Sequence, residues 1–153
     1  MEETAYFALG CFWGPEYNFS KIKGVLLTEV GYSGGDARSP TYEEVCSGGT
    51  GHVETVKIVF DQKIIGYEEL LKEFWKMHNP AQSDGQGPDI GDQYKSAIFY
   101  TSEKKKREAE KSKEKEQKKH KDKITTLIIQ FKEFWRAEEY HQNYIKKTGR
   151  FVC

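Results

Sequence analysis

The stretch AYFALGCFWGPE, residues 5–16, predicts the first strand, the first helix and the turn that joins them. Its first five residues are an apolar run typical of a buried strand, and Pro15 suits the first turn of a helix. Cys11 therefore lies at a strand-to-helix junction, followed directly by Phe12 and Trp13. A helix N-terminus favours the nucleophilic thiolate, and two aromatic rings can hold an apolar group beside the sulfur. The stretch thus predicts a reactive thiol in an apolar setting.

Strands and helices alternate along the rest of the chain. The pattern predicts strands at 4–9, 25–32, 52–60, 94–100 and 124–130, and helices at 14–22, 39–45, 65–78, 103–123 and 137–147. A long loop rich in Gly, Pro, Asp and Gln spans residues 79–91, and loops of this length are usually functional or disordered. We expect one α+β domain over residues 1–153, a two-layer, plait-like arrangement with a central mixed sheet and helices packed on it.

Composition excludes several classes of protein. The formal net charge is zero, so nothing global favours nucleic acid or an anionic membrane surface as a partner. No run approaches 18 apolar residues, and the acidic N-terminus does not resemble a signal peptide, so we expect no membrane contact and a cytoplasmic location. The three cysteines are an odd, widely spaced set that suits free thiols in a reducing compartment.

Neither a metal site nor a bound cofactor is expected. The chain contains no CxxC, HExxH, GxGxxG or GxxxxGK[ST] pattern. The helix at 103–123 consists almost entirely of charged and amide residues with Glu/Lys pairs at helical spacing. Such a helix is typical of a solvated surface; the alternative is a basic docking surface, which the interleaved acidic residues weaken.

Glu54 is a candidate general acid. It belongs to the face of the strand 52–60 that also carries Val56, Ile58 and Phe60. A carboxyl near the end of such an apolar row is partly desolvated, which raises its pKa and lets it donate a proton near neutral pH. The alternative is a strand-end side chain that reaches solvent or an ion pair.

Tyr32, Asp89 and Tyr94 stand at junctions of loops and strands in Gly-rich surroundings. Loops carry function more often than strand interiors, and a tyrosine hydroxyl can bind an oxygen while its ring lines a pocket. Taken singly, each tyrosine is more typical of a core or surface position than of a catalytic one.

The other cysteines and the histidines carry weaker signals. Cys46 follows the apolar Val45 and is typical of a small buried hydrophobe. Cys153 is the last residue, either an incidental tail cysteine or a resolving thiol that reaches Cys11. His141 lies in the helix expected at 137–147, where a packed side chain is more typical than a ligand.

Seven blocks, in order along the chain, make the sequence resemble the peptide methionine sulfoxide reductase A family. They are GCFWG at 10–14, GYSGG at 31–35, EVCSG at 44–48, TGHVE at 50–54, NPAQ at 79–82, DIGDQYKSAI at 89–98 and AEEYHQ at 137–142. One block would be weak evidence, whereas the ordered set is highly specific.

The resemblance implies reduction of the S epimer of methionine sulfoxide, free or in oxidised proteins, as protein repair under oxidative stress. Cys11 matches the nucleophile, and Glu54 matches the acid that protonates the sulfoxide oxygen. Phe12 and Trp13 match the wall that holds the substrate methyl group. The surrounding groups that bind and orient the sulfoxide oxygen are matched by Tyr32, Asp89 and Tyr94. The resemblance further implies a sulfenic acid at Cys11, recycled through a second thiol and an external dithiol such as thioredoxin.

The sequence departs from the family pattern at two places. Lys95 stands where Arg is common, which keeps the charge and loses the planar fork, so we expect a tuned site. Many members carry two C-terminal cysteines, whereas this chain has only Cys153, so that either Cys153, Cys46 or an external thiol resolves the sulfenic acid. Two other functions stay open from residues alone: a thiol peroxidase or disulfide reductase using Cys11, and a module that binds an acidic partner through residues 104–123.

Overall fold

The computed structural model describes residues 1–150 of the chain. Within that range the strands are β1 Glu2–Leu9, β2 Val25–Ser33, β3 Val53–Asp61, β4 Gly85–Gln86, β5 Asp89–Ile90, β6 Ser96–Tyr100, β7 Leu127–Gln130 and β8 Trp135–Arg136. The α-helices are α1 Trp13–Ser20, α2 Tyr42–Cys46, α3 Tyr67–Lys76, α4 Glu103–Gln117 and α5 Tyr144–Thr148, and two short 3-10 helices are η1 Asp92–Tyr94 and η2 Glu139–His141.

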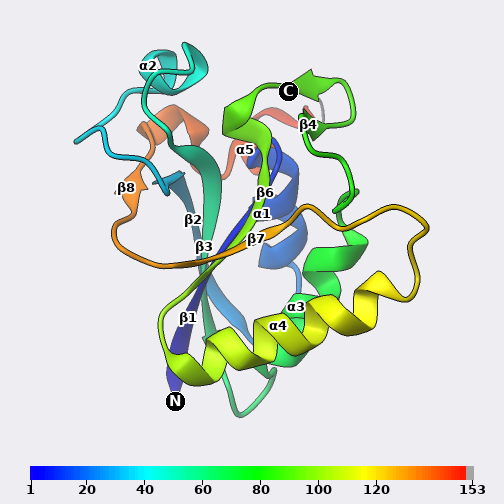
Figure 1. Ribbon diagram of the computed structural model, residues 1–153. Coiled ribbons are helices and arrows are strands. Elements are labelled where there is room, and N and C mark those ends of the chain that lie inside the picture. The colour runs from blue at the N-terminus through cyan, green and yellow to red at the C-terminus, as the bar shows by residue number, and fades with distance from the viewer. Residues whose placement is uncertain (151–153) are drawn as a thin grey trace.

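Six of these strands form one sheet in the order β7-β6-β1-β3-β2-β8 (Figure 1). All neighbouring pairs are antiparallel except β6 and β7, which are parallel. The sheet is therefore mixed, and helices pack against it, which confirms the α+β architecture expected from the sequence.

The main hydrophobic core lies between the sheet and the helices α1 and α3. Leu70, Leu71 and Phe74 are fully buried because they recur on one face of α3, and they join Phe7 of β1 and Ile58 of β3 in one cluster. α4 lies outside α3, where the indole Nε1 of Trp75 donates to the Ser112 hydroxyl at 2.8 Å.

An extended segment covers the opposite face of the sheet. After β7 the chain crosses this face to reach β8 at the far edge (Figure 1). The ring of Phe131 stacks on Tyr6 with centroids 4.0 Å apart, and the ring of Phe134 lies 5.7 Å from Tyr6. A Cβ at Gly31 would lie 2.6 Å from the ring of Phe134, so a glycine is needed where the segment meets β2.

The charged helix is solvated, as expected, but shorter than expected. Ala109 is the one fully buried residue of α4, and the helix ends at Gln117 rather than at residue 123. Gln117 accepts from the backbone N–H of Ile124 and donates to the carbonyl of Asp122, so its side chain holds the turn that follows. None of the helices within residues 1–150 is long and apolar enough to span a membrane.

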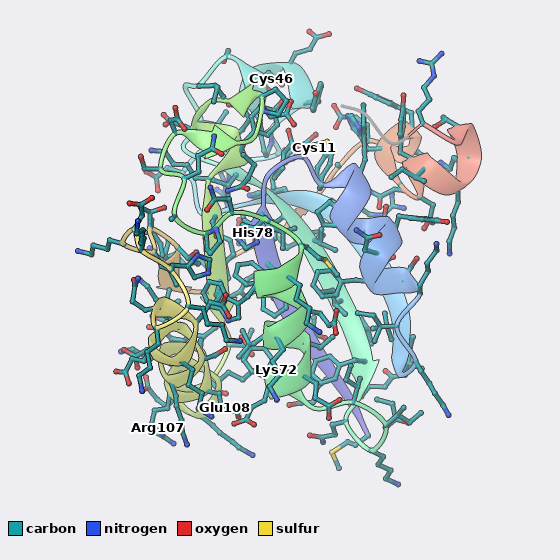
Figure 2. The ribbon with its side chains drawn as sticks, turned by 90° about the vertical axis from the view of Figure 1, so that its right-hand side faces the viewer. Cys11, Cys46, Lys72, His78, Arg107 and Glu108 are labelled. Carbon is teal, nitrogen blue, oxygen red and sulfur yellow. The ribbon has the colours of Figure 1, made fainter. Side chains whose placement is uncertain are left out.

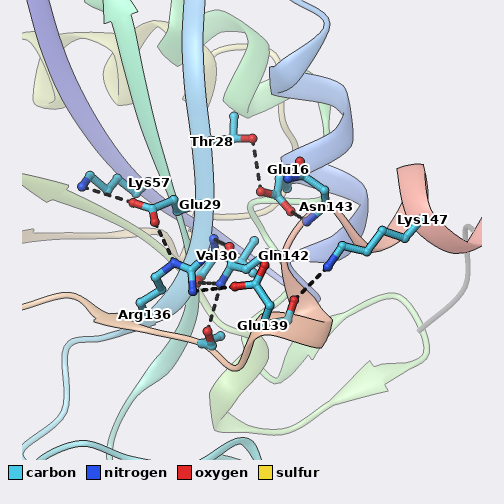
Figure 3. A network of polar contacts seen from close by, with 11 residues as sticks. Glu16, Thr28, Glu29, Val30, Lys57, Arg136, Glu139, Gln142, Asn143 and Lys147 are labelled. Carbon is cyan, nitrogen blue, oxygen red and sulfur yellow. Dashed lines mark hydrogen bonds and ion pairs between the residues drawn. The ribbon is translucent and has the colours of Figure 1, made fainter.

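The prediction of a single helix at 137–147 is wrong. The structure has η2 and α5 there, separated by Asn143, which adopts a left-handed φ of 53°. The Gln142 amide pairs with both the N–H and the carbonyl of Val30 at 2.9 Å, and the Glu16 carboxylate accepts from the N–H of Asn143 at 2.8 Å (Figure 3). These tertiary hydrogen bonds outweigh the local helical preference.

The long loop at 79–91 is ordered by its own hydrogen bonds. β4 and β5 pair as a small hairpin within it. The Gln86 side chain accepts from the N–H of Asn79 at 2.8 Å and donates to the carbonyl of Asn79 at 2.6 Å. The loop thus has a defined path, which places Asp89 and Tyr94 at one end of the sheet.

Candidate active site

Cys11 lies in the turn between β1 and α1, at the end of the molecule that also carries α2 and the β4–β5 hairpin (Figures 1 and 2). Gly10 precedes it with a φ of +98°, and a Cβ at Gly10 would lie 2.8 Å from the Cβ of Gln86. A glycine is therefore needed for the hairpin to approach the turn. The thiol position predicted from the sequence, at a strand-to-helix junction, is the one observed.

Glu54 stands directly behind this turn, at the start of β3. Its side chain is 1% exposed, and Oε1 accepts from the backbone N–H of Phe12 at 3.2 Å. Its other oxygen, Oε2, is buried without a hydrogen-bond partner within residues 1–150. Burial, with a smaller contribution from the charge of Asp89, raises the pKa of Glu54 to about 8 against the opposing effect of the Phe12 hydrogen bond. The carboxyl is therefore protonated at neutral pH, and the alternative of a solvent-exposed or ion-paired side chain is wrong.

Tyr32 is the cross-strand partner of Glu54 in the β2–β3 ladder and is fully buried. Its hydroxyl donates to Oε1 of Glu138 at 2.9 Å, while Oε2 of Glu138 accepts from the N–H of Tyr42 at 2.8 Å. Burial and the Glu138 carboxylate raise the pKa of Tyr32 far above its ordinary value. Tyr32 therefore keeps its proton throughout the physiological range.

Asp89 and Tyr94 approach the same carboxyl from the 79–95 segment. Both are half-buried, Asp89 in β5 and Tyr94 in η1. Asp89 contributes to the raised pKa of Glu54, and after burial the charge of Glu54 is the next cause that raises the pKa of Tyr94. The structure thus brings the sequence-predicted Tyr32, Asp89 and Tyr94 around Glu54.

Aromatic side chains form a wall beside Cys11. The ring of Phe12 is buried 5.8 Å from the ring of Tyr32. Trp13 is half-buried and stacks on Tyr144 of α5, with centroids 3.7 Å apart and planes 8° apart. The apolar wall predicted from Phe12 and Trp13 is therefore extended by a ring from the C-terminal segment.

His141 belongs to this wall, which the sequence did not indicate. It is buried, and its ring lies 5.2 Å from Phe12 and 4.4 Å from Tyr42. The indole Nε1–H of Trp13 donates to Nδ1 of His141 at 3.0 Å, so the neutral imidazole carries its proton on Nε2. Its position is fixed by η2 rather than by the helix expected there.

The cysteines differ from expectation. Cys46 is exposed and free, so its prediction as a buried hydrophobe is wrong. α2 has only five residues, and Val45 is the one that faces the core, which turns the neighbouring Cys46 outward. Cys11 is disulfide-bonded, and since Cys46 is free, Cys46 is not its partner. Cys153 lies outside the described residues.

Lys95 is exposed and forms an ion pair with Asp92 at 3.0 Å. Its charge is thus directed to η1, at the rim of the site. The functional groups that sequence reasoning missed are Tyr42, Glu138, His141 and Tyr144. The block of residues 137–142 was a signal for Glu138 and His141 only, and nothing marked Tyr42 or Tyr144, because the contacts of these groups join segments far apart in the chain.

Comparison with known proteins identifies a family to which this chain is similar. The family model described as peptide methionine sulfoxide reductase matches residues 3–153. A peptide methionine sulfoxide reductase MsrA of Methanosarcina mazei is 51% identical over 149 residues, which cover 96% of this chain and 71% of that protein. Crystalline Mxr1 of Saccharomyces cerevisiae in reduced form aligns with a TM-score of 0.93 at 36% identity, covering 99% of this chain and 88% of that one.

Mxr1 has also been solved in complex with Trx2. That structure aligns with a TM-score of 0.68 at 25% identity and covers 94% of this chain and 84% of Mxr1. The chain described here belongs to the peptide methionine sulfoxide reductase family.

Proposed function

We propose that this methionine sulfoxide reductase acts on the S epimer, free or in proteins, with Cys11 as the nucleophile and Glu54 as the general acid. The observation that carries the proposal is the Glu54 carboxyl, 1% exposed and with Oε2 unpartnered within residues 1–150, directly behind the Cys11 turn. A buried, protonated carboxyl beside a cysteine is what proton donation to a sulfoxide oxygen requires.

In the first step the Cys11 thiolate attacks the sulfoxide sulfur while Glu54 gives its proton to the oxygen. The sulfoxide S–O bond and the transient bond between the two sulfur atoms then break as the OH group passes to the Cys11 sulfur, and methionine leaves. Cys11 is now a sulfenic acid, so the sulfoxide is reduced by two electrons and the cysteine is oxidised by two. The oxygen gains basicity as the sulfur is attacked, and a proton delivered at that moment lowers the barrier.

The surrounding residues suit a small polar S=O group that carries an apolar methyl. Phe12 and Trp13 form the apolar wall against which the methyl would rest. Asp89 lies close enough to Glu54 to raise its pKa, and Glu54 lies close enough to Tyr94 to raise the pKa of that hydroxyl. We assign Asp89 and Tyr94 to orienting the sulfoxide oxygen and the Glu54 carboxyl. We assign Tyr32 to the same group on its position opposite Glu54.

A second thiol then condenses with the sulfenic acid, releasing water and forming a disulfide. We assign this role to Cys153, supported by the free state of Cys46 and by the presence of only three cysteines in the chain. Thioredoxin is our proposed reductant for this disulfide, because the similar Mxr1 is known in complex with Trx2. Recycling by cytosolic dithiols also favours a cytoplasmic location.

We treat residues 1–153 as one such domain. The family match over residues 3–153 and the continuous core that joins sheet and helices support this assignment.

The test is turnover of each methionine sulfoxide epimer with dithiothreitol as the reductant. We expect Cys11→Ser to abolish reduction of the S epimer and Glu54→Gln to slow it by roughly 10²–10⁴-fold. Cys46→Ser, which alters an exposed free cysteine, is the matched control and should turn over at the wild-type rate.

Peroxide consumption by the same variants separates the alternative chemistry. A thiol peroxidase or disulfide reductase would need Cys11 and not Glu54. Full sulfoxide reduction by Cys11→Ser, or equal losses of peroxide and sulfoxide reactivity in Glu54→Gln, would contradict the proposal.

A further inference from the structure

Tyr32 and Glu54 face each other in the β2–β3 ladder, yet their side chains are not hydrogen-bonded through Oε2 of Glu54. Directly opposed residues of antiparallel strands lie on the same face with their Cβ atoms about 5 Å apart, and the charge of Glu54 acts on the Tyr32 hydroxyl. A tyrosine hydroxyl beside a carboxyl would ordinarily donate to it. Within residues 1–150, Oε2 of Glu54 instead has no partner, so the hydroxyl proton must be committed elsewhere.

That proton is held by Glu138. Oε1 of Glu138 accepts from the Tyr32 hydroxyl at 2.9 Å, and Oε2 accepts from the backbone N–H of Tyr42 at 2.8 Å. Burial acts to raise the pKa of Glu138, but the hydrogen bonds from Tyr42 and Tyr32 prevail and lower it below the ordinary value. The side chain is thus an ionised carboxylate, which can only accept.

We propose that Glu138 is a positioning residue of the active site: by accepting the Tyr32 hydroxyl proton, it keeps that proton away from the Glu54 carboxyl. The inference rests on the proposed role of Glu54 as general acid. A hydroxyl donated to Glu54 would stabilise its ionised form and remove the proton that the reaction needs near neutral pH. Glu138 therefore keeps the Glu54 carboxyl protonated without contacting it.

Other titratable groups also surround Glu54, and none is placed as Tyr32 is. Asp89 from β5 and Tyr94 from η1 interact with its charge, as do Tyr42 and Cys46 from α2. Tyr42 interacts with both Cys46 and Tyr94, so these three groups influence one another's pKa beside Glu54. Around Glu138 lie the Tyr32 and Tyr140 hydroxyls and His141.

Substitution of Glu138 by glutamine should change the direction in which the Tyr32 hydroxyl donates its hydrogen bond. The N–H of Tyr42 can only donate, so the glutamine must offer its carbonyl oxygen there and its NH₂ group to the Tyr32 oxygen. The Tyr32 hydroxyl then has to donate in another direction, and Glu54 is its cross-strand neighbour. Glu138→Gln is isosteric, so this change requires no movement of the backbone.

The experiment measures the Glu54 titration directly, by carbon-13 NMR of the full chain labelled at its glutamate carboxyls. The Glu54 signal is identified by its loss in Glu54→Gln. We expect Glu138→Gln to lower the titration midpoint of Glu54 by roughly one pH unit. Adding Tyr32→Phe to Glu138→Gln should restore the wild-type midpoint, because the hydroxyl is then absent.

Two variants control for fold and charge. Glu139→Gln alters the neighbouring glutamate, which is exposed and paired with Arg136 at 2.9 Å, and should leave the midpoint unchanged. Glu138→Met removes both acceptors and should shift the midpoint in the same direction as Glu138→Gln, again only while Tyr32 is present. A midpoint unmoved by Glu138→Gln and Glu138→Met, or a shift that persists with Tyr32→Phe, would overturn the inference.

The pH dependence of sulfoxide reduction separates this inference from the proposed function. If both hold, the alkaline limb of the rate profile moves to lower pH together with the NMR midpoint. A moved midpoint with an unmoved alkaline limb would refute Glu54 as the acid and leave the positioning by Glu138 intact.

Discussion

Glu54→Gln should make the protein more stable at neutral pH while it disables catalysis. The pKa of Glu54 is about 8 in the folded chain against an ordinary value of 4.5. Between these two values the folded state keeps a proton that the unfolded state has lost. The free energy of unfolding contributed by this group is therefore highest below pH 4.5 and falls as the pH rises toward 8.

The size of the effect follows from the same two values. Each pH unit in this window lowers the wild-type free energy of unfolding by about 1.4 kcal/mol. At pH 7, which lies about 2.5 units above the ordinary value of 4.5, the loss is about 3 kcal/mol. Glutamine does not titrate and still offers a carbonyl oxygen to the N–H of Phe12, so the variant escapes this loss.

Urea unfolding of wild type and Glu54→Gln, both kept reduced, tests this between pH 5 and 8.5. The stability difference should grow by about 1.4 kcal/mol per pH unit and level off above pH 8. Glu110→Gln is the matched control: it alters an exposed glutamate of α4, the helix whose labelled residues Arg107 and Glu108 lie far from Cys11, and its stability difference should not follow this pH course (Figure 2). A constant difference for Glu54→Gln across this range would refute the raised pKa.

Further predictions concern the pH dependence of sulfoxide reduction, the turn at Gly10 and the C-terminal Cys153. The rate of sulfoxide reduction should fall above pH 8, as Glu54 loses its proton, in a pH profile taken at saturating substrate; an unchanged rate to pH 9.5 would argue against this acid. Gly10→Ala should destabilise the fold by about 2 kcal/mol in urea unfolding, because its φ is +98° and its Cβ would meet Gln86; a stability within the error of wild type would contradict the geometry. Cys153→Ser should keep dithiothreitol-supported turnover and lose most thioredoxin-supported turnover in a coupled assay; equal activity with thioredoxin would show that Cys11 is reduced without the tail.

The sequence predicted the parts of the site that depend on local pattern. Cys11 was placed by the change from a strand pattern to a helix pattern, and Glu54 by the alternation of apolar residues along one strand. Both signals lie within about ten residues, which is the range over which periodicity is informative.

The remaining parts depend on contacts between distant segments. Glu138 meets Tyr32 across 106 positions, and Trp13 meets His141 across 128, so no local pattern could place them. The helix expected at 137–147 failed for a similar reason, because the Gln142 amide completes the hydrogen bonding of β2. Cys46 was misplaced because α2 has five residues, too few for a helical period to define its buried face.

The most direct test of the account is a single turnover of the S epimer by Cys153→Ser without reductant, in the presence of a sulfenic-acid trap. Mass spectrometry of the digested protein should find the trap on Cys11, in an amount equal to the methionine formed. The R epimer should give neither product. Methionine formed without trap on Cys11, or formed equally by Cys11→Ser, would contradict Cys11 as the nucleophile.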